Sequence, residues 1–262
     1  MSIEDKTVTA ILVDGGFYRR RSFACLRDKT PKDRANELEE YCKRHLKERK
    51  GYRHQLYRIF YYDCPPIDKK VYNPLIKKQV DLGKSDTYKW SNEFFNCLKK
   101  KRKFALRYGK LADGQAQYVL TNKIFRKLCN GTIKFEDIKE EDCVLTIEQK
   151  GIDMKIGLDI ASLAYKHQVN QIVLISGDSD FVSAAKLARR EEIDFILDPL
   201  GAPIRPDLFE HIDGLNTCDK KIQIINTTKK SRVISTWLNE ILPVSLNKKS
   251  HLKSHFTYSI LP

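Results

Sequence analysis

Residues 171–198 read QIVLISGDSDFVSAAKLARREEIDFILD, and this stretch decides the fold. The apolar run at 171–176 is typical of a strand that is buried on both faces of a parallel sheet. The turn Gly177–Asp180 ends it, and a helix with one apolar side follows through about Arg190 before a second strand at 194–197. Strand, helix and strand in this order predict a right-handed crossover in a parallel, doubly wound sheet.

Segments nearer the N-terminus supply more strands and helices. Residues 8–13 form a short apolar, β-branched strand that ends at Asp14-Gly15-Gly16. Residues 56–62 and 104–108 indicate two further strands. Thr30 and Pro31 favour a helix start, as N-cap and first helical residue. The predicted helices are 30–51, 87–101 and one that begins near Asp153.

The rest of the chain divides less clearly. We interpret 113–145, rich in aromatic and charged residues, as an insertion of undefined shape. A last short strand is predicted at 222–225. Residues 227–262 carry many lysines against a single acid and are expected to form a basic C-terminal extension with a short helix around 232–241. The expected domains are therefore 1–226 and 227–262.

Composition limits the function classes. The 48 Lys and Arg residues exceed the 34 Asp and Glu residues, giving a formal net charge of +14. Such an excess attracts polyanions such as RNA, although a solvated basic surface explains it equally well. Seven cysteines without a CxxC pair favour a reducing cytoplasm. We expect no membrane span, because no apolar run reaches eighteen residues. A homo-oligomer stays open.

Four aspartates occupy the places where open parallel sheets bind ligands. Asp14 follows the first strand, Asp178 and Asp180 follow the strand at 171–176, and Asp153 begins the helix that precedes it. The carboxyl ends of parallel strands meet at one edge, so the four side chains are expected to converge. Without a cation they would repel one another, whereas Mg²⁺ or Mn²⁺ would remove that repulsion. Such an ion activates water for phosphodiester hydrolysis.

Each acid also has a structural interpretation. Asp14 is a turn or helix-capping residue in about two of three such positions, and Asp178 and Asp180 have similar odds of capping the next helix. Asp153 can simply favour its helix N-terminus. Three acids at matching edges weaken this interpretation without excluding it.

Three segments resemble the NYN family, a PIN-like nuclease group. They are ILVDGGF at 11–17, QKGID at 149–153 followed by GLD at 157–159, and LISGDSDF at 174–181. Their order and spacing also match that family. The similarity extends over about 7–200, with 65–145 matching loosely. In one departure, Phe17 follows Gly16 where many relatives place a nearby Asn.

The resemblance implies a three-layer α/β/α sandwich with a central parallel sheet and an acidic pocket for Mg²⁺ or Mn²⁺. Carried over by position, Asp14, Asp153 and Asp178 are the metal-binding acids and Asp180 supports them. Lys150 either neutralises the scissile phosphate or holds the acids together. Ser176 either orients a carboxylate or ends the strand.

The resemblance also implies endoribonuclease activity, and single-stranded or looped RNA is the expected substrate. Basic residues should surround such a site, although charge runs are commonly solvated faces. The alternatives are a non-catalytic RNA-binding adaptor on the same fold and a DNA nuclease. The predicted nucleic-acid contacts are Arg19, Arg20, Arg21, Lys99, Lys100 and Lys101.

Overall fold

The computed structural model describes residues 6–26, 28–47, 53–112, 114, 116–147 and 149–219. Six parallel strands form the central sheet, in the order β12-β11-β10-β1-β2-β5. The strands are β1 Lys6–Asp14, β2 Arg53–Asp63, β5 Phe104–Tyr108, β10 Gln171–Ile175, β11 Asp194–Asp198 and β12 Gly214–Leu215. The predicted parallel sheet is confirmed. The predicted strand at 222–225 and the extension from 227 lie outside the described residues.

Strand β1 lies inside the sheet because its residues suit burial on both faces. Ala10 to Val13 are fully buried, and successive side chains point to opposite sides. Leu12 packs into one hydrophobic cluster, while Ile11 and Val13 pack into the other. The absence of any alternation with polar residues in this run thus reflects two covered faces.

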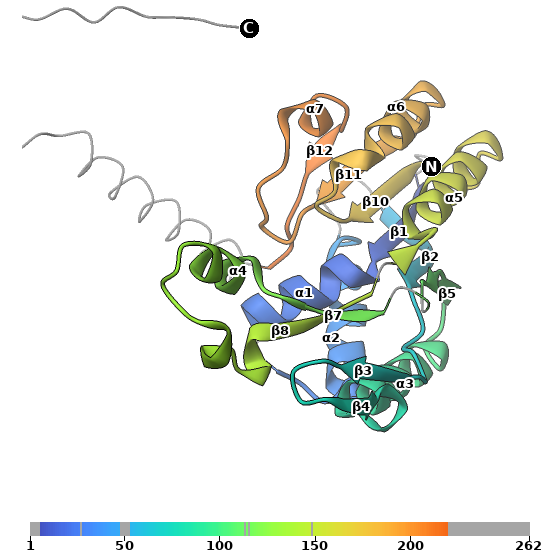
Figure 1. Cartoon of the computed structure of the whole chain (residues 1–262). Helices are drawn as coiled ribbons and strands as arrows, with labels where there is room; N and C mark the ends of the chain where they lie inside the picture. The colour runs from blue at the N-terminus through green and yellow to red at the C-terminus, as the bar shows by residue number, and fades with distance from the viewer. Residues whose placement is uncertain are drawn as a thin grey trace, which may run out of the picture. The chain divides into compact units, whose positions relative to one another are not determined.

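Helices cover both faces, which confirms the three-layer α/β/α architecture (Figure 1). One layer contains α5 Ile152–Tyr165 and α6 Val182–Arg190, the latter preceded by the short helix η5 Ser179–Phe181. The other layer contains α1 Gly15–Leu26, α2 Pro31–Arg44 and α3 Asp86–Lys99. Helix α2 begins as predicted, with the Thr30 hydroxyl accepting from the Asp33 N–H at 3.2 Å.

Helix α1 is the main element that the sequence did not indicate. It begins at Gly15, directly after β1, where the sequence pattern left Asp14 as either a turn or a helix-capping residue. A Cβ atom on Gly15 would lie 2.6 Å from the Tyr61 ring and 2.6 Å from the Tyr62 carbonyl oxygen. Glycine is therefore needed here for close contact between α1 and β2.

The region between β2 and α5 carries small antiparallel additions. Strands β3 Lys70–Asn73 and β4 Lys78–Asp81 form a hairpin that leads into η1 Leu82–Lys84. Beyond β5, β6 Lys110–Leu111 pairs with β9 Gln149–Lys150, and β7 Gln117–Leu120 pairs with β8 Cys143–Thr146. Between β7 and β8 lie α4 Asn122–Cys129, η3 Phe135–Asp137 and η4 Glu140–Asp142. In the described part of the chain, no helix has the length and apolar character to cross a membrane.

The two glycines Gly15 and Gly157 should respond to alanine in opposite ways. We expect Gly15→Ala to lower the free energy of unfolding by about 1–3 kcal/mol, because the new methyl group meets β2. Gly157 lies inside α5 with nothing within 4 Å of an added Cβ, so Gly157→Ala should stabilise by about 1 kcal/mol. Urea denaturation measures both. Equal responses would contradict the packing argument.

Candidate active site

The carboxyl ends of β1 and β10 meet at one edge of the sheet. Val13 pairs with Ile175, so Asp14 and Ser176 follow side by side. The Ser176 hydroxyl donates to Asp14 Oδ2 at 3.2 Å and accepts from the Asp178 N–H at 3.3 Å. One buried serine thus joins the loops that carry two of the predicted acids, in keeping with the orienting role considered for it.

Two of the acids also cap helices. Asp14 Oδ1 accepts from the Phe17 N–H at 3.0 Å, in the first turn of α1. Asp178 Oδ1 accepts from the Asp180 N–H at 3.1 Å and caps η5. The structural interpretation of these residues therefore applies as well. Capping occupies one oxygen of each carboxylate and fixes its orientation.

Asp153 is electrostatically coupled to the other three predicted acids. It lies in the first turn of α5, after Gly151, whose φ of 78° is left-handed. Asp153 is exposed as a residue, but partial desolvation of its carboxylate raises its pKa, and the negative charges of Asp14, Asp178 and Asp180 raise it further. Burial also raises the pKa of Asp14, although hydrogen bonds from the Phe17 N–H and Ser176 oppose the shift. The structure thus brings Asp14, Asp178 and Asp180 within electrostatic reach of Asp153.

The chemistry of this donor set suits a hard divalent cation. Carboxylate oxygens are the ligands that Mg²⁺ and Mn²⁺ prefer, and the repulsion felt by Asp153 is one that a cation would relieve. Among the described residues, however, no three acidic, histidine or cysteine side chains are gathered closely enough to hold a metal ion. The acids thus fit a cation by type and charge, but their spacing in this structure does not itself form a metal site.

Asp63 is a fifth acid at this edge, and it was not among the predicted site residues. It ends β2, is 1% exposed, and its charge raises the pKa of Asp14. Arg19 Nη2 donates to its Oδ1 at 2.9 Å, and the Tyr61 hydroxyl donates to its Oδ2 at 3.1 Å. Its position after a predicted strand was the available signal, the same one that marked Asp14.

The three arginines of α1 point to different partners. Arg19 is bound to Asp63 and contacts Ser91 Oγ at 3.4 Å. Arg20 is exposed, and its positive charge acts to lower the pKa of Asp14. Arg21 donates twice to the Leu200 carbonyl oxygen, at 3.2 and 2.7 Å. Arg20 is thus the arginine of this run that presents its charge to the acid cluster.

The lysines that were predicted to contact nucleic acid lie at the C-terminal end of α3 and just beyond it. Lys99, Lys100 and Lys101 precede β5, whereas the acids follow the carboxyl ends of β1 and β10. Lys101 Nζ binds Glu39 Oε2 at 2.6 Å and Asn36 Oδ1 at 2.8 Å, which ties α3 to α2. Lys99 Nζ lies 5.9 Å from the centre of the Tyr108 ring. The structure does not bring this basic run together with the aspartates.

Gln149 and Lys150 form β9, which follows the insertion and directly precedes α5. Lys150 is exposed in β9 and faces Lys110 across the β6–β9 pair. A Cβ atom on Gly16 would lie 3.2 Å from Gln149 Oε1 and 3.5 Å from Asp14 Oδ1. Gln149, the first residue of the QKGID motif, is therefore a polar neighbour of Asp14, a role that was not predicted for it.

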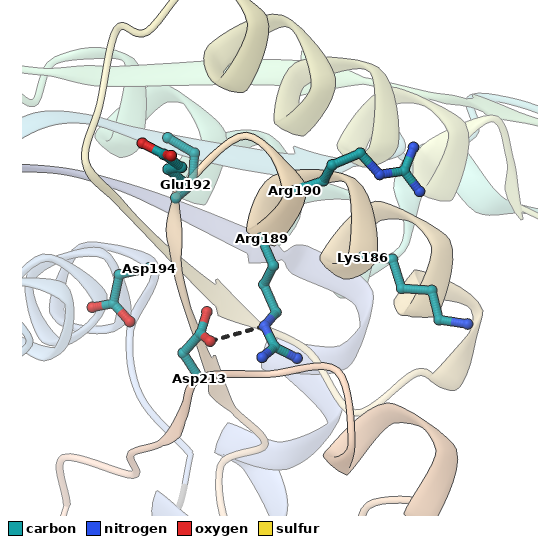
Figure 2. A pocket seen from close by; sticks show the side chains of 7 residues that line it. Lys186, Arg189, Arg190, Glu192, Asp194 and Asp213 are labelled. Carbon is teal, nitrogen blue, oxygen red and sulfur yellow. Dashed lines mark ion pairs between the residues drawn. The ribbon is translucent and has the colours of Figure 1, made fainter.

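Two hollows differ in their relation to the acids. One, of 540 Å³, includes Gly16, Arg20 and Gln149 in its lining and so adjoins Asp14. The other, of 690 Å³, lies where α6 ends and β11 begins, and its charged side chains appear in Figure 2. There Arg189 Nε pairs with Asp213 Oδ1 at 2.9 Å. Three basic and three acidic residues line this second hollow, so its charges balance and indicate neither an anion site nor a cation site.

Comparison with known proteins places these observations in a family context. The chain matches the NYN domain over residues 87–200, which confirms the resemblance seen in two of the three motifs. The first motif, at 11–17, precedes the matched range. No curated protein matches the chain. A crystal structure of a protein of unknown function from Vibrio parahaemolyticus is similar, with 14% identity, a TM-score of 0.44, and coverage of 84% of this chain and 98% of that one.

Without a bound cation, repulsion among the clustered aspartates should lower the free energy of unfolding. Because the pKa of Asp153 is higher in the folded than in the unfolded chain, ionisation as the pH rises through the folded pKa removes stability. We expect Asp153→Asn to raise Tm at pH 7 by about 1–2 °C, a small effect because the side chain is exposed. Differential scanning fluorimetry from pH 4 to 8 measures it.

Glu136→Gln is the matched control, since Glu136 is an exposed acid in η3. It should leave Tm unchanged over the same pH range. Mn²⁺ should raise the Tm of the wild type more than that of Asp153→Asn, because the variant has lost one of the repelling charges. A lower Tm for Asp153→Asn at pH 7 would contradict the assigned electrostatics.

Proposed function

We propose, from the premise that residues 87–200 belong to the NYN domain family, that this protein is a metal-dependent ribonuclease acting at its aspartate cluster. NYN domains are nuclease-type hydrolases. The observation that carries the proposal is the electrostatic coupling of Asp153 to Asp14, Asp178 and Asp180, which come from three separate segments. Aspartates that only cap helices need not lie near one another, whereas a cation site requires its carboxylates to be close together.

Asp14, Asp153 and Asp178 would hold Mg²⁺ or Mn²⁺, with Asp180 in support. The bound ion would supply an activated water and neutralise charge on the phosphate. The chain's own residues prepare the site. Ser176 holds Asp14 in one orientation through its hydroxyl hydrogen bond, and Arg20 offers a positive charge beside Asp14 to an incoming phosphate. Lys150 keeps its two proposed roles, at the phosphate or among the acids.

The proposed preference for single-stranded RNA rests on the net charge of the chain and on the hollow beside the acids. The net charge of +14 favours a polyanion, and the hollow beside the acids has room for unpaired nucleotides. An adaptor without catalysis and a DNA nuclease share these features, so both are outcomes of the first experiment. RNA hydrolysis is the activity that we propose.

Cleavage of labelled single-stranded RNA and DNA of equal sequence tests the function directly. We expect RNA cutting with Mn²⁺ or Mg²⁺ and none with EDTA. Asp178→Asn should reduce the rate at least about 100-fold, because one carboxylate that holds the ion is lost. Glu136→Gln should cut like the wild type.

Different results separate the alternatives. Equal activity in Asp178→Asn and wild type would place the cutting at another site or in a contaminant. RNA binding without cleavage of either nucleic acid would support the adaptor. Cleavage of DNA alone would identify a DNA nuclease.

Ser176→Ala tests the orienting role of the hydroxyl. Loss of the hydrogen bond to Asp14 Oδ2 should weaken Mn²⁺ activation about 10- to 100-fold, as for other residues that hold a metal ligand. The Mn²⁺ concentration for half-maximal cleavage is the quantity to measure. Ser176→Thr keeps the hydroxyl and should retain most of the affinity, whereas equal behaviour of both variants would argue against this role.

A further inference from the structure

The 540 Å³ hollow beside the acid cluster has an aromatic wall. Trp90 and Phe23 line it from α3 and α1, with ring centroids 5.9 Å apart. Trp90 stacks on the fully buried Phe94, with centroids 5.1 Å apart, and its Nε1 donates to the Lys29 carbonyl oxygen at 3.1 Å. Phe23 is 45% exposed. The wall therefore combines one fixed indole ring with one accessible phenyl ring.

The hollow reaches the aspartates through Gly16. An atom at the position of a Gly16 Cβ would lie 3.5 Å from Asp14 Oδ1 and 3.8 Å from Arg20 Nη1. Arg19 lines the same hollow and is held by Asp63, the acid next to Asp14. A nucleotide whose phosphate lies at the acid cluster would thus meet the charge of Arg20 at the entrance of the hollow, beside Arg19, whose charge is paired with Asp63.

Charge changes sign across the hollow. Arg19 and Arg20 lie at the end near Asp14, whereas Asp28 and Asp86 line the hollow elsewhere. Lys29 also lines it there, and its ammonium group is paired with Glu37. Past Asp28 the surface continues into a neighbouring depression whose acids are Asp28, Asp33, Glu37 and Glu40. A phosphate is repelled there, while the N–H groups of a nucleobase find carboxylate acceptors. The polarity favours a base inside the hollow and its phosphate at the arginine end.

We propose that this hollow, defined by Phe23, Trp90, Arg19 and Arg20, binds one unpaired nucleobase of the strand whose phosphate lies at the aspartates. Base stacking on aromatic rings accepts any base, and the volume is within the range of small-ligand sites. A base inside the hollow cannot be paired, so the hollow selects single strands. The inference rests on the proposed function for the position of the phosphate.

Binding without cleavage tests the pocket. The background is Asp178→Asn with Trp237→Phe, which leaves Trp90 as the single tryptophan of the two in the sequence. We expect short single-stranded RNA to quench the Trp90 fluorescence. Phe23→Ala should weaken binding about 10-fold or more, the effect of losing one stacked base. An RNA that lacks the base at the nucleotide entering the hollow should bind the background protein as weakly as the intact RNA binds the Phe23→Ala variant.

Phe135→Ala is the control, because Phe135 is an exposed phenylalanine, 67% accessible, in η3. It should bind RNA as tightly as the background protein, and a blunt duplex should leave the Trp90 fluorescence unchanged. Equal RNA affinity of the Phe23→Ala and Phe135→Ala variants would overturn the pocket. If the wild type still cuts RNA, the nuclease survives that result. Conversely, affinity that depends on Phe23 in a protein without cleavage would retain the pocket and reject the nuclease.

Discussion

The parallel pairing of β1 with β10 is the constraint on which the candidate site depends. Five residues of each strand pair in register, and these central strands are buried on both faces. A slip of one residue would turn every side chain to the opposite face, so the packing of two hydrophobic clusters specifies the register. The same register puts Asp14 beside Ser176, and their hydrogen bond joins the two loops. Core packing thereby determines where the acids lie.

Capping and function are compatible in this arrangement. The Phe17 N–H at the start of α1 donates to Asp14 and favours its ionised form, and the Asp180 N–H in η5 donates to Asp178. Burial and neighbouring carboxylates have the opposite effect on Asp14. Helix starts therefore compensate part of the cost of gathering negative charge. This explains why the sequence pattern of a cap and that of a candidate catalytic acid coincide at these positions.

Local rules explain which features could be predicted. The four aspartates follow strands or begin helices, and the Thr30 cap needs only its own helix. The missed or misplaced features depend on partners far along the chain: Arg19 binds Asp63, 44 residues away, and Arg21 binds Leu200, 179 residues away. Helix α4 lies in the segment whose shape was not predicted, and it buries no residue against the rest of the fold. Such contacts exist only once the sheet has formed.

The proposed nuclease site is made of acids and must still attract a polyanion, and the distribution of basic residues limits how it does so. Lys101 is bound to Glu39, and the run that contains it precedes β5, so it does not offset the aspartates directly. Near the cluster, Arg20 supplies the positive charge, while the overall charge of +14 acts over distances that salt screens. Stacking on Phe23 and Trp90 is much less sensitive to salt than these charges. An aromatic pocket beside the acids would therefore supply affinity that the acids themselves oppose.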